Sequence, residues 1–278
     1  MEFLKRNEAP LSENDWERID KVVVETAKRV LVGRRFIEIS GPFVPSVQFV
    51  PYDYIEDGNS GACGLFGEVD CGVVKVKERK ILPLPIIYKD FKIHWRDIES
   101  SKKFNIPIDF SIAAAAASQV AIAEDRLIFH GDIETGFPGL LNVEGKNSIS
   151  ISDWNQTGEA FKDILNAIVK LNENGFYNNF ALVLNPQDYA MLHRLYGNSG
   201  ILEIDQIRKL FDVGVFTTPV IPQFTAVVVS TGIENLDLFI SQDMITSYLN
   251  YDNMDHYFRV FEILALRIKR PQCICTIE

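Results

Sequence analysis

Histidine, serine and paired acidic residues are the side chains of this sequence that could carry catalysis or bind a metal. The four histidines lie far apart and form no H-E-x-x-H or E-x-x-H pattern, the spacing that places metal ligands on one helix face: His94, His130, His193 and His256. An S-x-x-K string begins at Ser100, but no second motif of a serine enzyme supports it. The adjacent acids Glu124 and Asp125 diverge from each other, so we expect salt bridges or solvation there. The sequence therefore predicts no catalytic residue, no metal site and no enzymatic activity.

The four cysteines form no C-x-x-C pair that would indicate a metal or redox site: Cys63, Cys71, Cys273 and Cys275. Cys273 and Cys275 alternate along a predicted strand, so both side chains would share one face of a sheet. We expect these two to be reduced thiols, as is usual in a cytoplasmic protein.

The composition excludes several classes of protein. The 278 residues include 28 Lys and Arg against 38 Asp and Glu, and the net charge of −10 gives no basic surface for nucleic acid. The longest apolar runs are shorter than the ~20 residues that a membrane span requires. Charges interrupt the opening Met1–Arg6, so it does not have the pattern of a signal peptide. We expect a cytoplasmic protein that binds neither nucleic acid nor membrane.

Two elements of different character occupy the first 90 residues. A helix over 12–32 is predicted, because Ser12 and Asp15 have the spacing of a capping box and Gly33 fits the end of the helix. Five glycines follow between residues 51 and 85, without helical periodicity. There Val74–Lys77 alternates as a strand does, and we expect Glu68–Asp70 to pair with it in a long β-arm. A lone hairpin is marginally stable in water, so such an arm indicates support from another subunit.

The pattern of the remaining chain indicates one discontinuous domain with an inserted α/β lobe at about 137–225. We predict a strand over 89–95, a helix over 112–129 that ends at Gly131, and later helices over 159–171 and 203–211. The predicted strands are 180–184, 226–230, 236–240 and a long one over 258–269. Because no convergent site emerges, we expect a binding or structural protein whose arm and terminal helix serve assembly.

Several strings, in this order and spacing, resemble the encapsulins, bacterial shell proteins that share the fold of tailed-phage capsids. The resemblance covers nearly the whole chain and rests on Met1–Arg6, Gly33–Phe36, Gly41-Pro42, Leu82–Leu84, Glu124-Asp125, Ile128-Phe129, Gly131, Gly139–Leu141, Thr217–Pro219, Gln242-Asp243 and Leu266-Arg267. It implies an α+β, Hong Kong 97-type capsid fold with a peripheral domain, an extended β-hairpin loop and an axial domain. The implied division is 1–47 for the N-terminal helix and start of the peripheral domain, 48–90 for the β-arm, 91–136 for the spine helix, 137–225 for the axial domain and 226–278 for the closing strands.

In encapsulins the N-terminal helix helps to form a groove for a C-terminal peptide of the cargo enzyme. By position, the resemblance implies groove residues at Trp16, Ile19, Val23, Arg34, Glu38, Asp243, Ile245 and Thr246. Family members often have Asp where this chain has Glu38, so the chain departs from the family pattern at that contact. An apolar groove edged by one cation and several acids would suit a peptide of small apolar residues with a charged end. The alternative for Arg34 and Glu38 is a structural salt bridge.

The resemblance also implies a position for a pore and raises the question of a cofactor. The loop Tyr196, Gly197, Asn198, Ser199 and Gly200 falls where the family's axial domain surrounds the five-fold pore, the alternative being an ordinary surface turn. Some relatives bind flavin near a tryptophan that corresponds to Trp95. Because Lys92–His94 departs from that pattern, we expect Trp95 to lie in the core or at an interface, and we expect no cofactor in the shell chain.

The resemblance implies a self-assembling icosahedral homo-oligomer that encloses a cargo enzyme. The expected cargo is a ferritin-like or hemerythrin-like iron oxidase, which would make the particle an iron store with iron in its lumen; a dye-decolorizing peroxidase is the rival cargo. Two other functions stay open. A prophage major capsid protein packaging DNA would share the fold, and an unrecognised soluble enzyme would need a site that the sequence does not reveal.

Overall fold

Two sheets and a long two-stranded arm make up the protein in a computed structural model, which describes residues 2–55, 61, 63, 65–67, 72–132, 135–198 and 200–278. The strands are β1 (Ile39–Ser40), β2 (Phe49–Ile55), β3 (Val76–Pro83), β4 (Ile86–His94), β5 (Asn147–Ile149), β6 (Phe180–Leu184), β7 (Gly214–Thr217), β8 (Ala226–Ser230), β9 (Leu236–Asp252), β10 (Asp255–Ile268) and β11 (Ile274–Ile277). The α-helices are α1 (Glu13–Val30), α2 (Trp95–Phe104), α3 (Ser111–His130), α4 (Glu159–Glu173), α5 (Pro186–Met191) and α6 (Glu203–Arg208). No helix in this described part of the chain is long and apolar enough to cross a bilayer.

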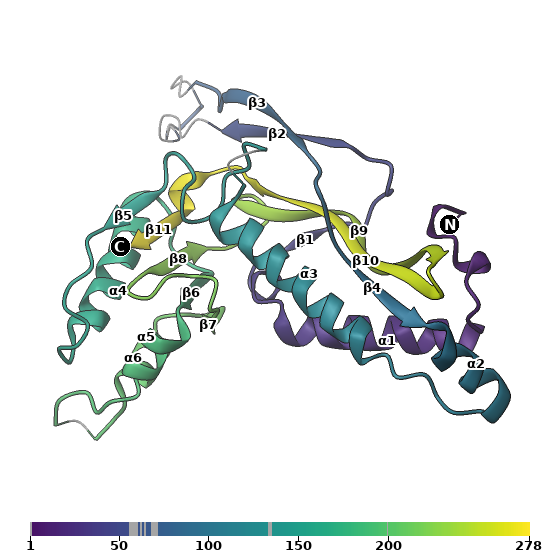
Figure 1. Ribbon diagram of the computed structural model, residues 1–278. Helices are drawn as coiled ribbons and strands as arrows, with labels where there is room; N and C mark the ends of the chain where they lie inside the picture. The colour runs from purple at the N-terminus through teal and green to yellow at the C-terminus, as the bar shows by residue number, and fades with distance from the viewer. Residues whose placement is uncertain are drawn as a thin grey trace.

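The first sheet has the strand order β1-β9-β10-β4, and α1 and α3 pack against it (Figure 1). The capping box at the start of α1 is confirmed, because the Asp15 amide donates to Ser12 Oγ at 3.2 Å and the Ser12 amide donates to Asp15 Oδ2 at 3.1 Å. Buried Ala113, Ala117 and Ala121 leave little side chain between α3 and its neighbours, so α1 approaches closely. The apolar stripe of α1 is therefore covered by α3 and the sheet.

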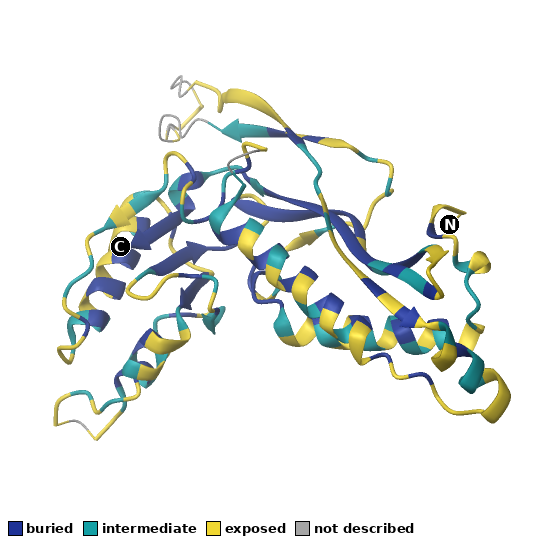
Figure 2. Ribbon diagram, in the orientation of Figure 1, coloured by how far each residue is buried: buried dark blue, intermediate teal, exposed yellow. Residues whose placement is uncertain are grey.

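The second sheet has the order β5-β11-β8-β6-β7, and α4 packs on it (Figure 1). All five residues of the predicted strand β6 are buried, as expected for a central strand covered on both faces. Helix α4 buries Ile164 and Ile168, whereas Leu165 is exposed. Figure 2 shows the resulting layer of buried strands. The hydrophobic core continues from this sheet to the part of the first sheet that lies near the C-terminal end of α3.

Two glycines, Gly131 and Gly139, lie in the connection between α3 and the part of the chain that contains the second sheet. Gly131 ends α3 with a φ of +66°, as its position predicted. A Cβ on Gly131 would lie 2.1 Å from the Phe137 carbonyl oxygen, and one on Gly139 would lie 2.3 Å from the Gly131 nitrogen. Only glycine allows the two backbone segments to approach this closely.

The arm is built differently from the prediction. Its antiparallel strands are β2 and β3, which pair from Phe49 with Pro83 to Ile55 with Val76. The prediction of a strand beginning at Val74 was wrong by two residues, and the expected partner Glu68–Asp70 lies outside the described residues. The pairing was missed because strand partners are set by contacts distant in sequence, whereas the alternation used for the prediction is local.

Other element boundaries also differ from the sequence prediction. Helix α1 ends at Val30, and Gly33 instead belongs to the 3-10 turn η3 (Gly33–Arg35), where a Cβ would lie 2.4 Å from Ile128 Cδ1. Strand β9 continues to Asp252, far beyond the predicted end at Ile240, because it pairs along its length with β10. Helix α6 ends at Arg208, three residues before the predicted end.

Candidate functional site

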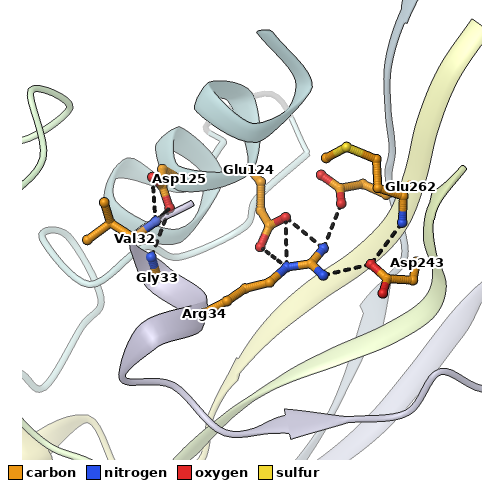
Figure 3. A network of polar contacts seen from close by, with 8 residues as sticks. Val32, Gly33, Arg34, Glu124, Asp125, Asp243 and Glu262 are labelled. Carbon is orange, nitrogen blue, oxygen red and sulfur yellow. Dashed lines mark hydrogen bonds and ion pairs between the residues drawn. The ribbon is translucent and has the colours of Figure 1, made fainter. Parts of the chain in front are cut away.

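Arg34 is the centre of an ionic network that joins three elements (Figure 3). Its Nε lies 2.8 Å from Glu124 Oε1 on α3, and its Nη2 lies 2.7 Å from Glu262 Oε2 on β10. Its Nη1 lies 2.6 Å from Asp243 Oδ1 on β9. The planar guanidinium suits this arrangement, since Nε and Nη2 both donate to Glu124 while Nη2 also reaches Glu262 and Nη1 reaches Asp243. The structural salt bridge considered for Arg34 is thus present, with these three acids as partners.

The network holds more negative than positive charge, and two of its three carboxylates are closed to water. Glu124 and Glu262 are fully buried, and the Arg34 side chain is 14% exposed. Burial alone would lower the pKa of Arg34, but its hydrogen bond with Glu124 and the charges of Glu124 and Glu262 raise that pKa. Burial and the neighbouring Glu124 raise the pKa of Glu262, whose Oε1 has no hydrogen-bond partner among the described residues. These surroundings favour the protonated form of Glu262.

Asp125 forms a second buried link between α3 and the segment after α1 (Figure 3). Its carboxylate accepts hydrogen bonds from the Val32 amide at 3.0 Å and the Gly33 amide at 2.9 Å. Burial raises the pKa of Asp125 to about 6 in spite of these two hydrogen bonds, which favour the charged form. The adjacent acids on α3 thus both anchor the turn that presents Arg34.

The eight residues predicted for a cargo groove are placed in different surroundings. Ile19 and Val23 are buried in the core between α1 and its neighbours, and Trp16 packs edge-on against Phe258 with ring centroids 5.9 Å apart. The Glu38 side chain is exposed, while its backbone carbonyl accepts from the Leu238 amide at 2.8 Å. Arg34 and Asp243 pair with each other, and the Asp243 side chain remains 56% exposed. The open acidic positions are therefore Glu38 and Asp243.

Ile245 and Thr246 lie beneath the first residues of the chain. Leu4 is 5% exposed and packs against a small apolar cluster to which Ile245 belongs. Arg6 donates from Nη2 to the Thr246 carbonyl oxygen at 2.9 Å. The N-terminal segment thus meets the side chains of Trp16 and Ile245 and the backbone of Thr246, and the role of these residues in peptide binding stays a prediction.

The predicted pore loop is a short projection between α5 and α6. At its base, Leu195 and Leu202 form a β-bridge, and Arg194 Nε lies 2.7 Å from the buried Glu203 carboxylate. The Tyr196 amide donates to the Ile201 carbonyl at 2.8 Å. Positive φ angles occur at Gly197 and Gly200, and Ser199 lies outside the described residues. The base of the loop is fixed by a buried ion pair, and its pore role stays a prediction.

Trp95 begins α2 and lines a small pocket of about 320 Å³ with Tyr251 and His256. Its ring centroid is 6.0 Å from that of His94. The expectation that Trp95 serves the fold or an interface, rather than flavin, stays a prediction. Among the described residues, no group of three or more His, Cys, Asp or Glu side chains is arranged to hold a metal ion.

The salt bridge expected at Glu124 is present, although the sequence did not name Arg34 as its partner, and sequence reasoning missed Glu262. Glu262 occupies a position in β10 where the alternating pattern of apolar residues continues on both sides. Glu124 lies in α3 between buried positions at Ala121 and Ile128. An acid at an otherwise apolar position is a signal for a buried partner, and Arg34 was the available cation.

Comparison with known proteins finds the same family over most of the chain. The family model described as "Encapsulating protein for peroxidase" matches residues 1–265. The "Type 1 encapsulin shell protein EncA" of Myxococcus xanthus is 45% identical over 277 residues, which cover 100% of this chain and 96% of that protein. A "Diheme-cytochrome-encapsulin shell fusion protein" of Kuenenia stuttgartiensis is 40% identical over 98% of this chain and 75% of its own length. A "Ferritin-like-encapsulin shell fusion protein" of Pyrococcus furiosus is 26% identical over 74% of this chain and 55% of its own length.

Solved structures show the same fold. The virus-like particle from Pyrococcus furiosus matches with a TM-score of 0.79 at 23% identity, covering 96% of this chain and 100% of that one. The capsid of Myoviridae phage XM1 matches with a TM-score of 0.64 at 13% identity, covering 88% and 90%. The prediction of an α+β capsid fold of the tailed-phage type is confirmed, and at these identities the likeness concerns the fold alone.

Proposed function

This chain belongs to the encapsulin family of shell proteins, and from that premise we propose that its copies close into an icosahedral cytoplasmic nanocompartment around a cargo enzyme. The chain is a shell protein and not an enzyme. The proposal concerns how the subunits assemble, which enzyme they enclose and how that enzyme is captured.

The exposed apolar face of the β2–β3 arm is the observation that carries the assembly proposal. The inner face of the arm packs on its own subunit through Val50 and Leu82, which contact a cluster that includes Phe239. On the outer face, Phe49 is 58% exposed and Ile81 is 69% exposed. Burying such side chains is worth roughly 1.5–3 kcal/mol each, so this face favours a covering partner. A neighbouring copy provides that partner in a closed shell.

The cargo is proposed to be a ferritin-like or hemerythrin-like iron oxidase, so that the particle stores and detoxifies iron. Support comes from the Pyrococcus furiosus relative, whose name joins a ferritin-like protein to an encapsulin shell in one chain. The description of the family as encapsulating peroxidase favours a second candidate cargo, a dye-decolorizing peroxidase. The name of the Kuenenia stuttgartiensis relative joins a diheme cytochrome to an encapsulin shell, so the protein attached to a shell differs among the relatives.

Capture is proposed to use a C-terminal peptide of the cargo, bound near the N-terminal helix. The exposed acids Glu38 and Asp243 favour a peptide with basic character, and Ile245 offers an apolar neighbour. The loop at Tyr196–Gly200 is proposed to line a pore, because it projects from the lobe on a base held by the Arg194–Glu203 ion pair.

Co-expression with candidate cargoes tests these proposals. The chain is produced with a ferritin-like protein from its own genome, with and without the last residues of that protein, and the particles are assayed for cargo and iron. Tail-dependent loading with iron retained in the particles supports the proposal. Loading of a dye-decolorizing peroxidase in preference to the iron oxidase would contradict the iron-storage part, and particles rich in nucleic acid would favour the phage-capsid alternative.

A further inference from the structure

The first residues of the chain form a separate small element on the surface of the first sheet. Residues 2–8, here called the N-terminal strap, fold into two 3-10 turns, η1 (Glu2–Leu4) and η2 (Arg6–Glu8), which contact β9. Leu4 is 5% exposed and packs with Phe261 and Ile263 of β10. Phe3 meets the Phe261 ring edge-on at a centroid distance of 6.4 Å. Figure 1 shows the strap beside β9 and β10, near the end marked N.

Arg6 fastens the strap to two elements at once. Its Nη1 and Nη2 lie 2.7 Å from the two oxygens of Asp20 on α1. Its Nε and Nη2 donate to the Thr246 carbonyl oxygen on β9, at 3.1 and 2.9 Å. The guanidinium also stacks 4.5 Å from the centre of the Trp16 ring. One arginine therefore bridges the helix and the sheet across the residues predicted for the cargo groove.

The strap covers an open sheet edge. Strand β1 pairs with β9 only opposite Leu238 and Phe239, so from residue 241 onward the outer side of β9 pairs with no strand in the described part of the chain. The backbone of such an edge is a ready binding site for a peptide. Next to this edge the Trp16 ring lies against the Arg6 guanidinium, and Trp16 Nε1 is buried without a hydrogen-bond partner among the described residues, so this donor is left unsatisfied while the strap is in place.

The strap is held by few contacts of its own. Its described backbone hydrogen bonds are local: the Lys5 amide donates to the Glu2 carbonyl at 3.1 Å, the Glu8 amide to the Lys5 carbonyl at 3.0 Å and the Ala9 amide to the Arg6 carbonyl at 3.2 Å. Lys5 has a φ of 49°, an uncommon conformation for a residue other than glycine. The anchors are the buried Leu4, the partly exposed Arg6 and the edge contact of the exposed Phe3, and they act against the entropy of ordering the segment. Such a segment can exchange between a bound and a released state.

We propose that the N-terminal strap is a displaceable occupant of a peptide-binding surface, and that this surface accepts peptides with an apolar residue followed two positions later by arginine. The apolar residue takes the place of Leu4 against Phe261 and Ile263. The arginine takes the place of Arg6 between Asp20 and the Thr246 carbonyl. The inference rests on the proposed function to the extent that the natural peptide is the cargo tail, which would then compete with the strap.

Displacement is tested with a fluorescent heptapeptide of the strap sequence, residues 2–8, added to particles of known subunit concentration. Leu4→Ala/Arg6→Ala particles, in which the strap loses both anchors, should bind it at least about fivefold more tightly than wild-type particles. Asn7→Ala is the matched control, because Asn7 is exposed and lies in the same segment. A heptapeptide with alanine in place of its Leu and Arg should not bind. Equal affinity for the double variant and wild type, or binding of the alanine peptide, would overturn the proposal.

A second measurement avoids dependence on the double variant. In wild-type particles, excess heptapeptide should increase hydrogen exchange at the amides of residues 3–8, and unchanged exchange would count against displacement. Cargo loading then separates the two proposals. Tail-dependent loading together with no heptapeptide binding overturns the strap inference and leaves the proposed function intact. Heptapeptide binding without any tail-dependent loading supports the strap inference and contradicts the cargo proposal.

Discussion

Arg34 Nη2 lies 2.7 Å from Glu262 Oε2, so a residue that follows the first helix contacts a strand near the end of the chain. Glu124 on α3 completes the link from the other side of the guanidinium. These contacts fix the turn after α1 against both α3 and the first sheet. The surface that carries Glu38 and Asp243 therefore depends on a buried ion network for its shape.

Loss of the Arg34 charge is expected to destabilise the subunit strongly. Arg34→Gln leaves Glu124 and Glu262 buried without a cation, which costs about 3–5 kcal/mol. Thermal unfolding of purified protein measures the effect, with Arg35→Gln as the control, because Arg35 is exposed and donates to the Arg29 carbonyl. If Arg34→Gln unfolds no earlier than Arg35→Gln, the network does not hold the fold. A substitution at Arg34 is therefore expected to lower the stability of the subunit, whatever its effect on cargo binding.

Asp125 is expected to make stability depend on pH. Its folded-state pKa of about 6 lies above the ordinary value of 3.8, so the folded protein holds this proton more tightly than the unfolded chain. The resulting stabilisation is complete below about pH 4 and is lost as the pH rises to about 6. Asp125→Asn cannot titrate, so its melting temperature relative to wild type should rise by several degrees across that range. A difference that is constant with pH would show that Asp125 has an ordinary pKa.

A charge on the outer face of the arm is expected to block assembly without unfolding the subunit. Ile81→Asp places a carboxylate where an apolar side chain is 69% exposed, so the isolated subunit loses little while a covering neighbour would bury the charge. Size-exclusion chromatography should show a shift from particles to small species, with unchanged circular dichroism. Glu78→Gln, an exposed substitution on the same strand, should assemble normally. Intact particles from Ile81→Asp would mean that this face has no neighbour.

The thiols of Cys273 and Cys275 are expected to resist alkylation in the native protein. Both are fully buried; burial raises the pKa of the Cys273 thiol and raises that of Cys275 to about 11. Iodoacetamide treatment at pH 8 followed by mass spectrometry should leave both unmodified until denaturant is added. Modification at the same rate in native and denatured protein would contradict the burial of this strand.

The sequence determines some of these elements locally and others only through distant contacts. The start of α1, the end of α3 at Gly131 and the buried strand β6 follow from capping residues and apolar periodicity, so they could be predicted. The pairing of β2 with β3 and the full length of β9 depend on partners far away in the chain. Cys273 and Cys275 were both expected in one strand, and that prediction was wrong for Cys273. Cys273 ends the 3-10 turn η4 (Pro271–Cys273), and only Cys275 lies in β11, because the turn that begins at Pro271 moves the start of the strand to Ile274.

The candidate site could likewise be predicted only in part from the sequence. Family resemblance located Arg34 and Asp243, and the structure brings them within 2.6 Å. It could not reveal that Ile19 is enclosed or that the chain's own Leu4 and Arg6 cover Ile245 and Thr246. Those facts depend on how the N-terminal segment turns back across β9, and no local pattern in the sequence encodes that path.

The mass of the purified particle tests the central claim most directly. A single chain has a mass of 31.5 kDa, and the account predicts one closed species of many tens of copies, seen as a hollow sphere by electron microscopy. The Ile81→Asp variant should remain near the mass of one or a few chains. A wild-type protein that stays a monomer or small oligomer under native conditions would contradict the account.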